Sequence, residues 1–179
     1  MKRLGEARDA SRPQPQVDKA SEERKFLVFR LGEDEFALPV EAVVEVARAP
    51  DRVTRVPKAP KFLEGVINLR GAVLPVIDQR QRFDMPRLEQ RDGCRLVVVQ
   101  TARHRAGLIV DSVSEVLRTT AAAIKSAPDL TEDIARLVNG VVTIEAEGRI
   151  LLILDPAELL TRAERGLLDK FEGVAQAPS

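Results

Sequence analysis

Short apolar runs alternate with polar turns along most of the chain, and β-branched residues are frequent within the runs. This pattern is typical of β-hairpins, in which two strands flank a tight turn. Four hairpins are predicted, over residues 26–40, 65–78, 94–110 and 141–154, with turns at 32–35, 71, 101–105 and 145–148. Pro75 places the second strand of the 65–78 hairpin near a sheet edge or a bulge, because proline cannot donate a ladder hydrogen bond.

The segments between the hairpins carry weaker patterns. Residues 41–48 fit either a short helical turn or another strand, and the two prolines within residues 51–62 indicate a connecting loop. Residues 79–95 are polar and rich in arginine, which favours a solvated loop. Single helical turns are predicted at residues 119–127 and 131–138, each with a threonine as its N-cap.

The two ends of the chain differ from the middle. Residues 1–24 combine dense mixed charge with almost no apolar periodicity, which predicts a disordered tail. Near the other end, Asp155 and Pro156 supply an N-cap and a first-turn proline, so a helix is predicted to follow. The apolar face of this helix is expected to hold Leu159, Leu160 and Ala163. Residues 165–179 form a second tail.

The chain contains an internal repeat. Residues 26–46 align without gaps on residues 96–116, an offset of 70, so that apolar positions and the polar turn coincide. Residues 65–78 resemble residues 140–155, with an offset that drifts to 75 and then 77. Each unit alone is too small to bury a core well. We therefore expect two β lobes, at about residues 26–78 and 96–155, that pack as small barrels around one core and leave a groove at their seam.

The composition is that of one soluble domain with tails. The chain has 179 residues, 44% of them hydrophobic, and the domain is expected over residues 25–164. Its 28 basic and 28 acidic residues leave no net field to recruit nucleic acid or an anionic membrane. No apolar run reaches the roughly 18 to 20 residues needed to span a bilayer. The single Cys94 and the absence of a secretory signal indicate the reducing cytosol.

The sequence shows no catalytic or metal-binding constellation. The only histidine, His104, lies in a polar turn, and with the single Cys94 it supplies too few ligands for a structural zinc site. Cys94 is expected to be a strand residue near the core. Glycine-rich phosphate and dinucleotide motifs are also missing, so no cofactor is expected. Two alternatives stay open, namely an enzyme that uses Cys94 or His104 and a double-barrel protein that binds nucleic acid through the arginines of residues 80–105.

The stretch from Gly65 to Asp78, GVINLRGAVLPVID, resembles the CheW-type coupling proteins of bacterial chemosensory arrays. Further blocks follow the order of that family, with FLVFRLG starting at Phe26, VVEV at Val43 and GLIVDSVSEVL at Gly107. The resemblance covers about residues 25–164. It implies a mainly β fold of two intertwined five-stranded SH3-like barrels, with short helical turns and a C-terminal helix, in agreement with the repeat.

The function implied by this resemblance is that of a non-enzymatic adaptor. Such a protein couples methyl-accepting chemoreceptors to the histidine kinase CheA, and it binds the cytoplasmic tips of the receptors and the C-terminal regulatory domain of the kinase. No cofactor, metal, nucleic acid or membrane insertion belongs to this role. The protein is expected in the cytoplasm, associated with membrane-bound receptor arrays through its partners.

The resemblance also assigns site residues one by one. The positions that match the receptor side of the family are Val43, Gly65, Arg70 and Val116, with Asn68, Leu69 and Gly71 completing the NLRG signature. Glu45 matches a family acid that can pair with Arg70. For Arg70 two interpretations stay open, a direct contact with acidic or carbonyl groups of the receptor or a structural pair with Glu45. Gly65 is expected for its backbone conformation, and Val43 and Val116 either as core valines or as part of the seam.

Two stretches depart from the commonest family pattern. Residues 37–39 read Ala-Leu-Pro where Gly-Ile-Asp is frequent, and Gln79 replaces a leucine after the VID motif. These changes bear on the choice of partner and chemosensory system more than on the fold. The second copy of the hairpin, residues 140–155, has no arginine in its first strand, with Ile144 and Glu145 where Arg70 stands in the first copy. This asymmetry indicates that Arg70 serves the task of the adaptor and not the fold alone.

Overall fold

The computed structural model describes residues 18–101, 103–160, 165, 166 and 169. Within them the chain forms eleven strands, and all four predicted hairpins are present. The strands are β1 (Glu23–Leu31), β2 (Asp34–Pro39), β3 (Val43–Arg48), β4 (Leu63–Leu69), β5 (Ala72–Asp78), β6 (Arg95–Gln100), β7 (Arg105–Val110), β8 (Ser112–Thr120), β9 (Ile124–Lys125), β10 (Val138–Ile144) and β11 (Arg149–Leu154).

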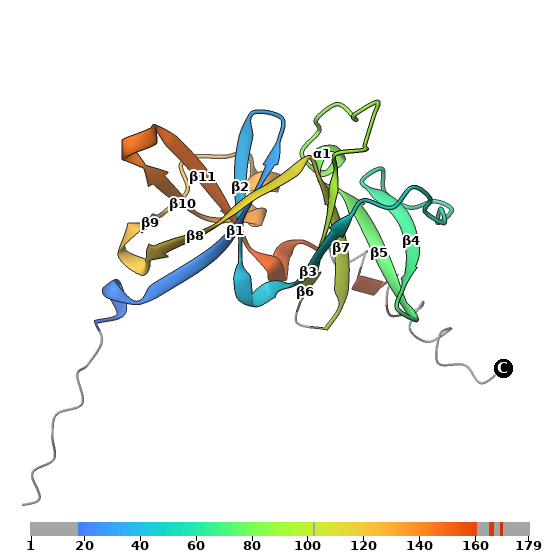
Figure 1. Ribbon diagram of the computed structural model, residues 1–179, viewed down its shortest axis with the longest axis horizontal. Helices are drawn as coiled ribbons and strands as arrows, with labels where there is room; N and C mark the ends of the chain where they lie inside the picture. The colour runs from blue at the N-terminus through green and yellow to red at the C-terminus, as the bar shows by residue number, and fades with distance from the viewer. Residues whose placement is uncertain (1–17, 102, 161–164, 167–168, 170–179) are drawn as a thin grey trace, which may run out of the picture.

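The strands form two sheets that stand side by side (Figure 1). One sheet has six strands in the order β8-β1-β2-β11-β10-β9, and the other has five in the order β3-β6-β7-β5-β4. The mainly β fold of two intertwined sheets is therefore confirmed. The expectation of five strands in each is corrected for the first sheet, because the two-residue strand β9 pairs with β10 at its edge.

The two repeat units exchange their first hairpins. The first hairpin of the chain, β1 and β2, lies between β8 and β11 of the second unit, whereas the β6 and β7 hairpin lies between β3 and β5 of the first unit. Two parallel pairings, β11 with β2 and β5 with β7, join the exchanged hairpins to their host sheets. Each sheet thus takes strands from both sequence units, which is how the barrels intertwine.

The pseudo-symmetry extends to irregular details of the ladders. Each unit carries a register shift in the strand before its second hairpin turn, between Leu63 and Gly65 in β4 and between Val138 and Gly140 in β10. A short pairing follows each shift. Thr54 bridges Val66 in the first unit, and β9 pairs with β10 in the second. The repeat in the sequence therefore reflects equivalent positions in three dimensions.

The core has three parts because the central strands are buried on both faces. The largest cluster lies between the sheets and includes alternate residues of β1, Leu27, Phe29 and Leu31. One smaller cluster fills the five-stranded barrel around Val76, and the other fills the six-stranded barrel around Phe26. This arrangement explains why several strands read as continuous apolar runs and not as strict alternation.

The connecting segments correct several expectations. Residues 41–48 satisfy both alternatives, since a 3-10 turn (Val40–Ala42) precedes β3. Helical turns do follow Thr120 and Thr131, at Ala121–Ala123 and at α2 (Glu132–Leu137), but neither threonine side chain makes a capping hydrogen bond. Pro75 is not on an edge strand, because β5 lies between β7 and β4. The alternative of a nearby bulge is confirmed, since the ladder shifts register opposite Val76 and Ile77. Pro75 precedes Val76, where the parallel pairing with β7 begins.

The ends of the domain are described only in part. The Asp155 carboxylate caps a 3-10 turn (Pro156–Glu158) in place of the start of an α-helix, and Leu159 and Leu160 after it are buried. Ala163 lies outside the described residues, as does most of the tail predicted at 165–179, but the described residues 165, 166 and 169 of that range are α-helical. At the other end a 3-10 turn (Lys19–Ser21) lies within the range predicted as a disordered tail, and β1 already starts at Glu23. Within the described residues, no helix has the length and apolarity needed to cross a membrane.

Candidate functional site

The candidate site is built around the tight turn between β4 and β5. Arg70 and Gly71 both have positive φ values, 52° and 85°, as the two central residues of a type I′ turn require. The Asn68 side chain stabilises the turn because its Oδ1 accepts a hydrogen bond from the Gly71 amide at 2.9 Å. The left-handed conformation is unfavourable for an arginine, and asparagine or glycine is the usual occupant of that position.

Arg70 makes an ion pair and is nevertheless open to solvent. Its Nη1 lies 3.1 Å from Oε2 of Glu45 on β3, but 79% of the Arg70 side chain is exposed. Since β3 and β4 are opposite edges of their sheet, this contact shows that the sheet curls into a barrel. An exposed pair of this kind contributes about 1 kcal/mol or less. The pair with Glu45 therefore exists and leaves the guanidinium accessible to a partner.

Gly65 has a structural requirement of its own. Its φ of 147° is unfavourable for any other residue, and a Cβ atom at this position would lie 2.1 Å from the carbonyl oxygen of Thr54. The close approach of the two backbones accompanies the bridge between Thr54 and Val66. Gly65 thus allows the barrel to close, and its backbone conformation is the one for which a glycine is needed.

The other predicted site residues lie at different depths. Val43, at the start of β3, is half-buried against the core between the sheets, and Leu69 is half-buried against the interior of the five-stranded barrel. Val116 is 52% exposed on β8, which belongs to the other sheet, so it is not a core valine. The fold brings Arg70, Glu45 and the turn residues together on one barrel and leaves Val116 on the other.

An equivalent arrangement exists on the second barrel and was missed in the sequence. Glu115 occupies the repeat position of Glu45, and Arg149 at the start of β11 places its Nη2 atom 2.6 Å from Glu115. The first strand of the second copy indeed holds no arginine, but the asymmetry between the copies lies in how their arginines are paired and not in the absence of one. The equivalent arginine comes from the second strand of the hairpin, and the alignment of the two acids within the repeat was the available signal.

Exposed apolar residues also occupy equivalent places near the two turns. We define the first tip as Glu45, Arg70, Val46 and Val73, and the second tip as Glu115, Arg149, Val116 and Ile150. All four of these apolar side chains are among the most exposed large hydrophobic residues of the described chain. Val73 lies opposite Asn68, and Ile150 lies opposite Thr143. In each hairpin this pair is the second one from the turn.

The two tips differ in how the arginine is paired. Arg149 is 23% exposed and contacts three carboxylates, those of Glu115, Glu147 and the buried Glu35. Two hydrogen bonds of 2.8 Å join Arg149 to both carboxylate oxygens of Glu35. These bonds lower the pKa of Glu35, and the bond with Glu35 is also the main reason that the pKa of Arg149 is raised. Arg149 is therefore a structural residue.

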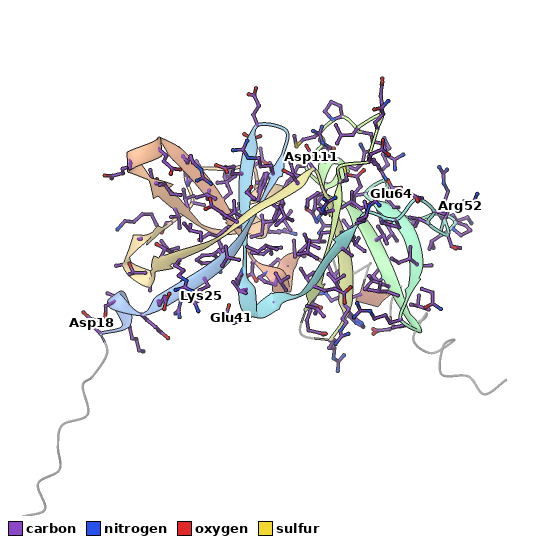
Figure 2. All side chains as sticks on the ribbon, viewed as in Figure 1. Asp18, Lys25, Glu41, Arg52, Glu64 and Asp111 are labelled. Atoms are coloured by element: carbon purple, nitrogen blue, oxygen red, sulfur yellow. The ribbon has the colours of Figure 1, made fainter. Side chains whose placement is uncertain are left out.

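Arginines of the 80–105 segment are engaged within the fold. Arg80 forms a two-bond contact with Asp111, at 2.7 and 2.5 Å, and Asp111 lies beside α1 (Gln79–Arg82) (Figure 2). Arg87 and Arg91 share two carboxylates, those of Glu64 and Asp78. These pairs neutralise much of the positive charge that nucleic acid binding would use, so nothing in the structure supports that alternative.

No catalytic group emerges from the described residues. Burial raises the pKa of Cys94, so the thiol is in its unreactive form at neutral pH. Cys94 lies in the core cluster as expected, but it precedes β6 and is not a strand residue. His104 is buried although it lies in the predicted polar turn, and its Nε2 lies 3.1 Å from a carboxylate oxygen of Asp169. The described part of the chain contains no group of three or more potential metal ligands.

Gln79 is the departure from the family pattern with the clearest structural result. It is fully buried, and neither polar atom of its side chain has a hydrogen-bond partner among the described residues. A leucine at this position would bury the same space without unsatisfied polar atoms. We therefore expect the domain to be less stable with Gln79 than with a leucine at this position.

The comparisons with known proteins agree with this geometry. The CheW-like domain model matches residues 25–164. The chain is 36% identical to the chemotaxis protein CheW of Rhizobium meliloti over 143 residues, which cover 79% of this chain and 90% of the relative. It is 32% identical to the protein FrzA of Myxococcus xanthus over 146 residues, which cover 82% and 91%.

A solved structure gives the same result. The scaffolding protein TtCheW of Thermoanaerobacter tengcongensis superposes with a TM-score of 0.68 at 32% identity, over 75% of this chain and 85% of that one. The two intertwined barrels, the turn with Arg70 and the blocks in their family order all lie inside the range that the domain model matches. The chain belongs to the CheW-like family.

Proposed function

We propose that this CheW-like chain is a non-enzymatic adaptor that couples methyl-accepting chemoreceptors to the histidine kinase CheA. The first tip binds the cytoplasmic tip of the receptor, with Arg70 as the principal contact. Val43 and Gly65 shape the barrel behind this tip, and Val116 makes a separate contact with the receptor from the other barrel. Other barrel surfaces bind the regulatory domain of CheA. The protein works in the cytoplasm and reaches the membrane only through these partners.

The observation that carries this proposal is that the turn holds an arginine at a position where its backbone conformation does not favour one. The turn would be more stable with asparagine or glycine there, because Arg70 holds a left-handed conformation. Its ion pair with Glu45 is too exposed to compensate by more than about 1 kcal/mol. A residue that is unfavourable for its local conformation, and whose contacts do not compensate in stability, is expected at a functional site.

An exposed guanidinium at the end of a hairpin suits recognition of a receptor helix. It presents a planar set of donors that carboxylates and backbone carbonyls can accept. Glu45 holds the side chain in one direction, so that less rotamer entropy is lost on binding. The similarity to CheW proteins and to FrzA at comparable identity does not distinguish one chemosensory system from another.

The proposal is tested by co-purification with the regulatory domain of CheA and a receptor cytoplasmic fragment. We expect a ternary complex with the wild-type chain. Arg70→Asn is expected to lose the receptor fragment and to keep CheA, because asparagine satisfies the turn and removes the guanidinium. Retention of the receptor by Arg70→Asn would assign the receptor contact to other residues.

A matched control separates the two interpretations of Arg70. Glu45→Gln removes the ion pair and keeps the arginine, so this variant is expected to bind the receptor with at most a few-fold loss. If Glu45→Gln loses the receptor as completely as Arg70→Asn, the pair and not the free guanidinium is the important feature. Failure of the wild-type chain to bind either partner would reject the adaptor function itself.

A further inference from the structure

The segment that connects β3 to β4 has a period of three residues in both burial and charge. Every third side chain is half-buried and apolar, and this set is Val53, Val56, Ala59 and Phe62. The side chain before each of these is exposed and basic, and we call Arg52, Arg55, Lys58 and Lys61 the basic set. Figure 2 shows Arg52 on the side of the five-stranded barrel that faces away from the other sheet. The basic set shares no residue with either tip.

The basic set and the other arginines of this barrel differ in their contacts. Arg80, Arg87 and Arg91 are paired with carboxylates inside the fold. The side chains of the basic set have no hydrogen bond or ion pair within the described part of the chain. Their positive charge adds to that of their neighbours, since burial lowers the pKa of Arg87 and the charges of Arg91 and Arg55 lower it further. The basic set therefore presents positive charge that is available to a partner.

The second barrel contains a counterpart of this segment with a different charge. In the first barrel Thr54 bridges Val66, and in the second Lys125 pairs with Val141. Since each valine follows the glycine at the register shift of its strand, Thr54 and Lys125 occupy equivalent positions. In this alignment the positions of the basic set hold exposed Ala123, Ser126, Asp129 and Glu132. The equivalent segment therefore accepts neutral and acidic side chains, and the fold does not require the four cations.

We propose that the basic set is a docking surface for an acidic segment of a partner protein. Carboxylates of that segment pair with the four cations, whose side chains are free to reach them because no described contact holds them. Four like charges within ten residues of sequence repel one another, so their presence needs a reason other than stability. Charge complementarity acts on the rate and the specificity of association more than on its strength, so the contact is expected to form rapidly and to be sensitive to salt.

A protein segment fits these observations better than a nucleic acid. A hollow of about 460 Å³ lies beside Arg52 and Arg55. Its lining includes three acids, Asp51, Glu64 and Asp92. A nucleic acid carries a phosphate at every nucleotide and would meet these carboxylates, whereas a protein segment can place its own carboxylates only opposite the cations.

A membrane surface also fits less well. The apolar side chains of the segment face inward, with Val53 packed in the interior of the five-stranded barrel and Ala59 and Phe62 packed on the core between the sheets. These side chains are therefore not available to insert among lipids, as the apolar face of a membrane-binding segment does.

The test uses a defined probe, a fluorescein-labelled peptide in which glutamate alternates with serine. The control is the same peptide with glutamine in place of every glutamate. Binding is followed by fluorescence anisotropy and by the backbone amide NMR signals of Arg55 and Lys58. We expect saturable binding of the glutamate peptide that shifts both signals and weakens as the salt concentration rises, and no binding of the glutamine peptide.

Charge reversal tests whether the peptide binds at the basic set. The double variant Lys58→Glu with Lys61→Glu is expected to weaken binding about tenfold or more, because two attractions become repulsions. The matched control, Lys25→Glu with Lys125→Glu, makes the same change of charge at exposed lysines of the six-stranded sheet and is expected to alter binding less than about twofold. Lys58→Gln with Lys61→Gln gives a smaller loss than the reversal and replaces it if the reversal disturbs the fold.

The counterpart segment of the second barrel allows the opposite experiment. A variant builds the basic set there through four substitutions, Ala123→Arg, Ser126→Arg, Asp129→Lys and Glu132→Lys. We expect this variant to bind two peptides per chain where the wild type binds one. A folded variant that still binds one peptide would show that the four cations are not the recognition element.

Three further results would overturn the proposal. The first is the absence of saturable binding by the wild-type chain, and the second is equal weakening in the control pair. The third is binding of phosphatidylserine vesicles, of an oligonucleotide or of a second copy of the chain that Lys58→Glu with Lys61→Glu loses while the glutamate peptide does not bind. These experiments need neither CheA nor a receptor, so their outcome is independent of the adaptor function.

Discussion

The two tips share a position in the repeat and differ in what holds the arginine. At the first tip, Arg70 has one carboxylate partner among the described residues and lies largely in solvent. At the second tip, Arg149 has three carboxylate partners, one of them buried. The same pairing of a hairpin arginine with Glu45 or Glu115 is therefore accessory on one barrel and structural on the other. In a pseudo-symmetric fold, one copy of an ion pair can therefore stabilise the domain while the other copy stays accessible to solvent and to a partner.

The largest expected difference between the two barrels is at Gly65 and Gly140, the equivalent glycines that precede the two tips. Gly65→Ala combines a strained positive φ with a backbone clash against Thr54, and we expect a loss of about 4 kcal/mol in the free energy of unfolding. Gly140→Ala is expected to lose about 2 kcal/mol, because its backbone is not strained but the added Cβ would lie 2.7 Å from Cγ2 of Ile124 and 3.1 Å from the carbonyl oxygen of Lys125. Urea unfolding measures both, and equal losses would show that the barrels close in the same way.

Removal of Arg149 is the next largest expected effect. Arg149→Ala leaves Glu35 buried with only Arg30, at 3.4 Å, as its remaining described partner, so we expect a loss of about 3 kcal/mol. At about 2 to 4 °C per kcal/mol, the melting temperature falls by roughly 10 °C. The double variant Arg149→Met with Glu35→Leu is expected to recover most of this loss, because no charge is left buried. If Arg149→Ala loses less than about 1 kcal/mol, the value of an exposed pair, the second tip is as dispensable as the first.

The second tip is also expected to make stability depend on acidic pH. Arg149 lowers the pKa of Glu35 below its usual 4.5 in the folded state. The resulting stabilisation is complete above the pKa of the unfolded chain and is lost as the pH falls through the lowered pKa of the folded state. Urea midpoints measured from pH 6 down to pH 3 should therefore fall more steeply for the wild type than for Glu35→Gln. Parallel curves would contradict this role of Glu35.

The smallest effect on stability is expected at the first tip. Arg70→Asn removes an exposed ion pair and relieves the left-handed arginine, and these two effects nearly cancel, so the free energy of unfolding changes by about 1 kcal/mol or less. Differential scanning calorimetry should place its melting temperature within a few degrees of the wild type. A loss as large as the one expected for Arg149→Ala would mean that Arg70 is a structural residue as well.

The hairpins were predictable because each lies within a short stretch of sequence. Alternation and turn residues identified the strands, and the repeat identified two equivalent units. The exchange of hairpins was expected only from the family resemblance, which implies intertwined barrels, because the choice between two equivalent neighbouring sheets depends on the packing of Leu27, Phe29 and Leu31 against the other barrel. Local patterns do not encode that choice.

At the candidate site, the sequence predicted the turn between β4 and β5 but not how its side chains are paired. The family pattern and the NLRG letters led to Arg70 and Glu45, and their contact is present. Arg149 was missed because it lies after the turn, where no letter-by-letter alignment places it opposite Arg70. The burial of His104 was missed because its neighbours in the chain are charged, and its partner Asp169 comes from the far end of the sequence.

The exchanged hairpins make the two halves of the sequence mutually dependent. A chain cut in the loop between α1 and β6 gives one fragment that holds β1 to β5 and another that holds β6 to β11, and each lacks central strands of both sheets. Neither fragment has a complete sheet around which to fold, whereas the two together restore every pairing. Folding of the intact chain must also join β1 to β8, with partners such as Phe26 and Leu117 far apart in sequence, before the six-stranded sheet is complete. The same strands that connect the barrels thus make the molecule a single cooperative unit, in which neither tip can be presented without the other.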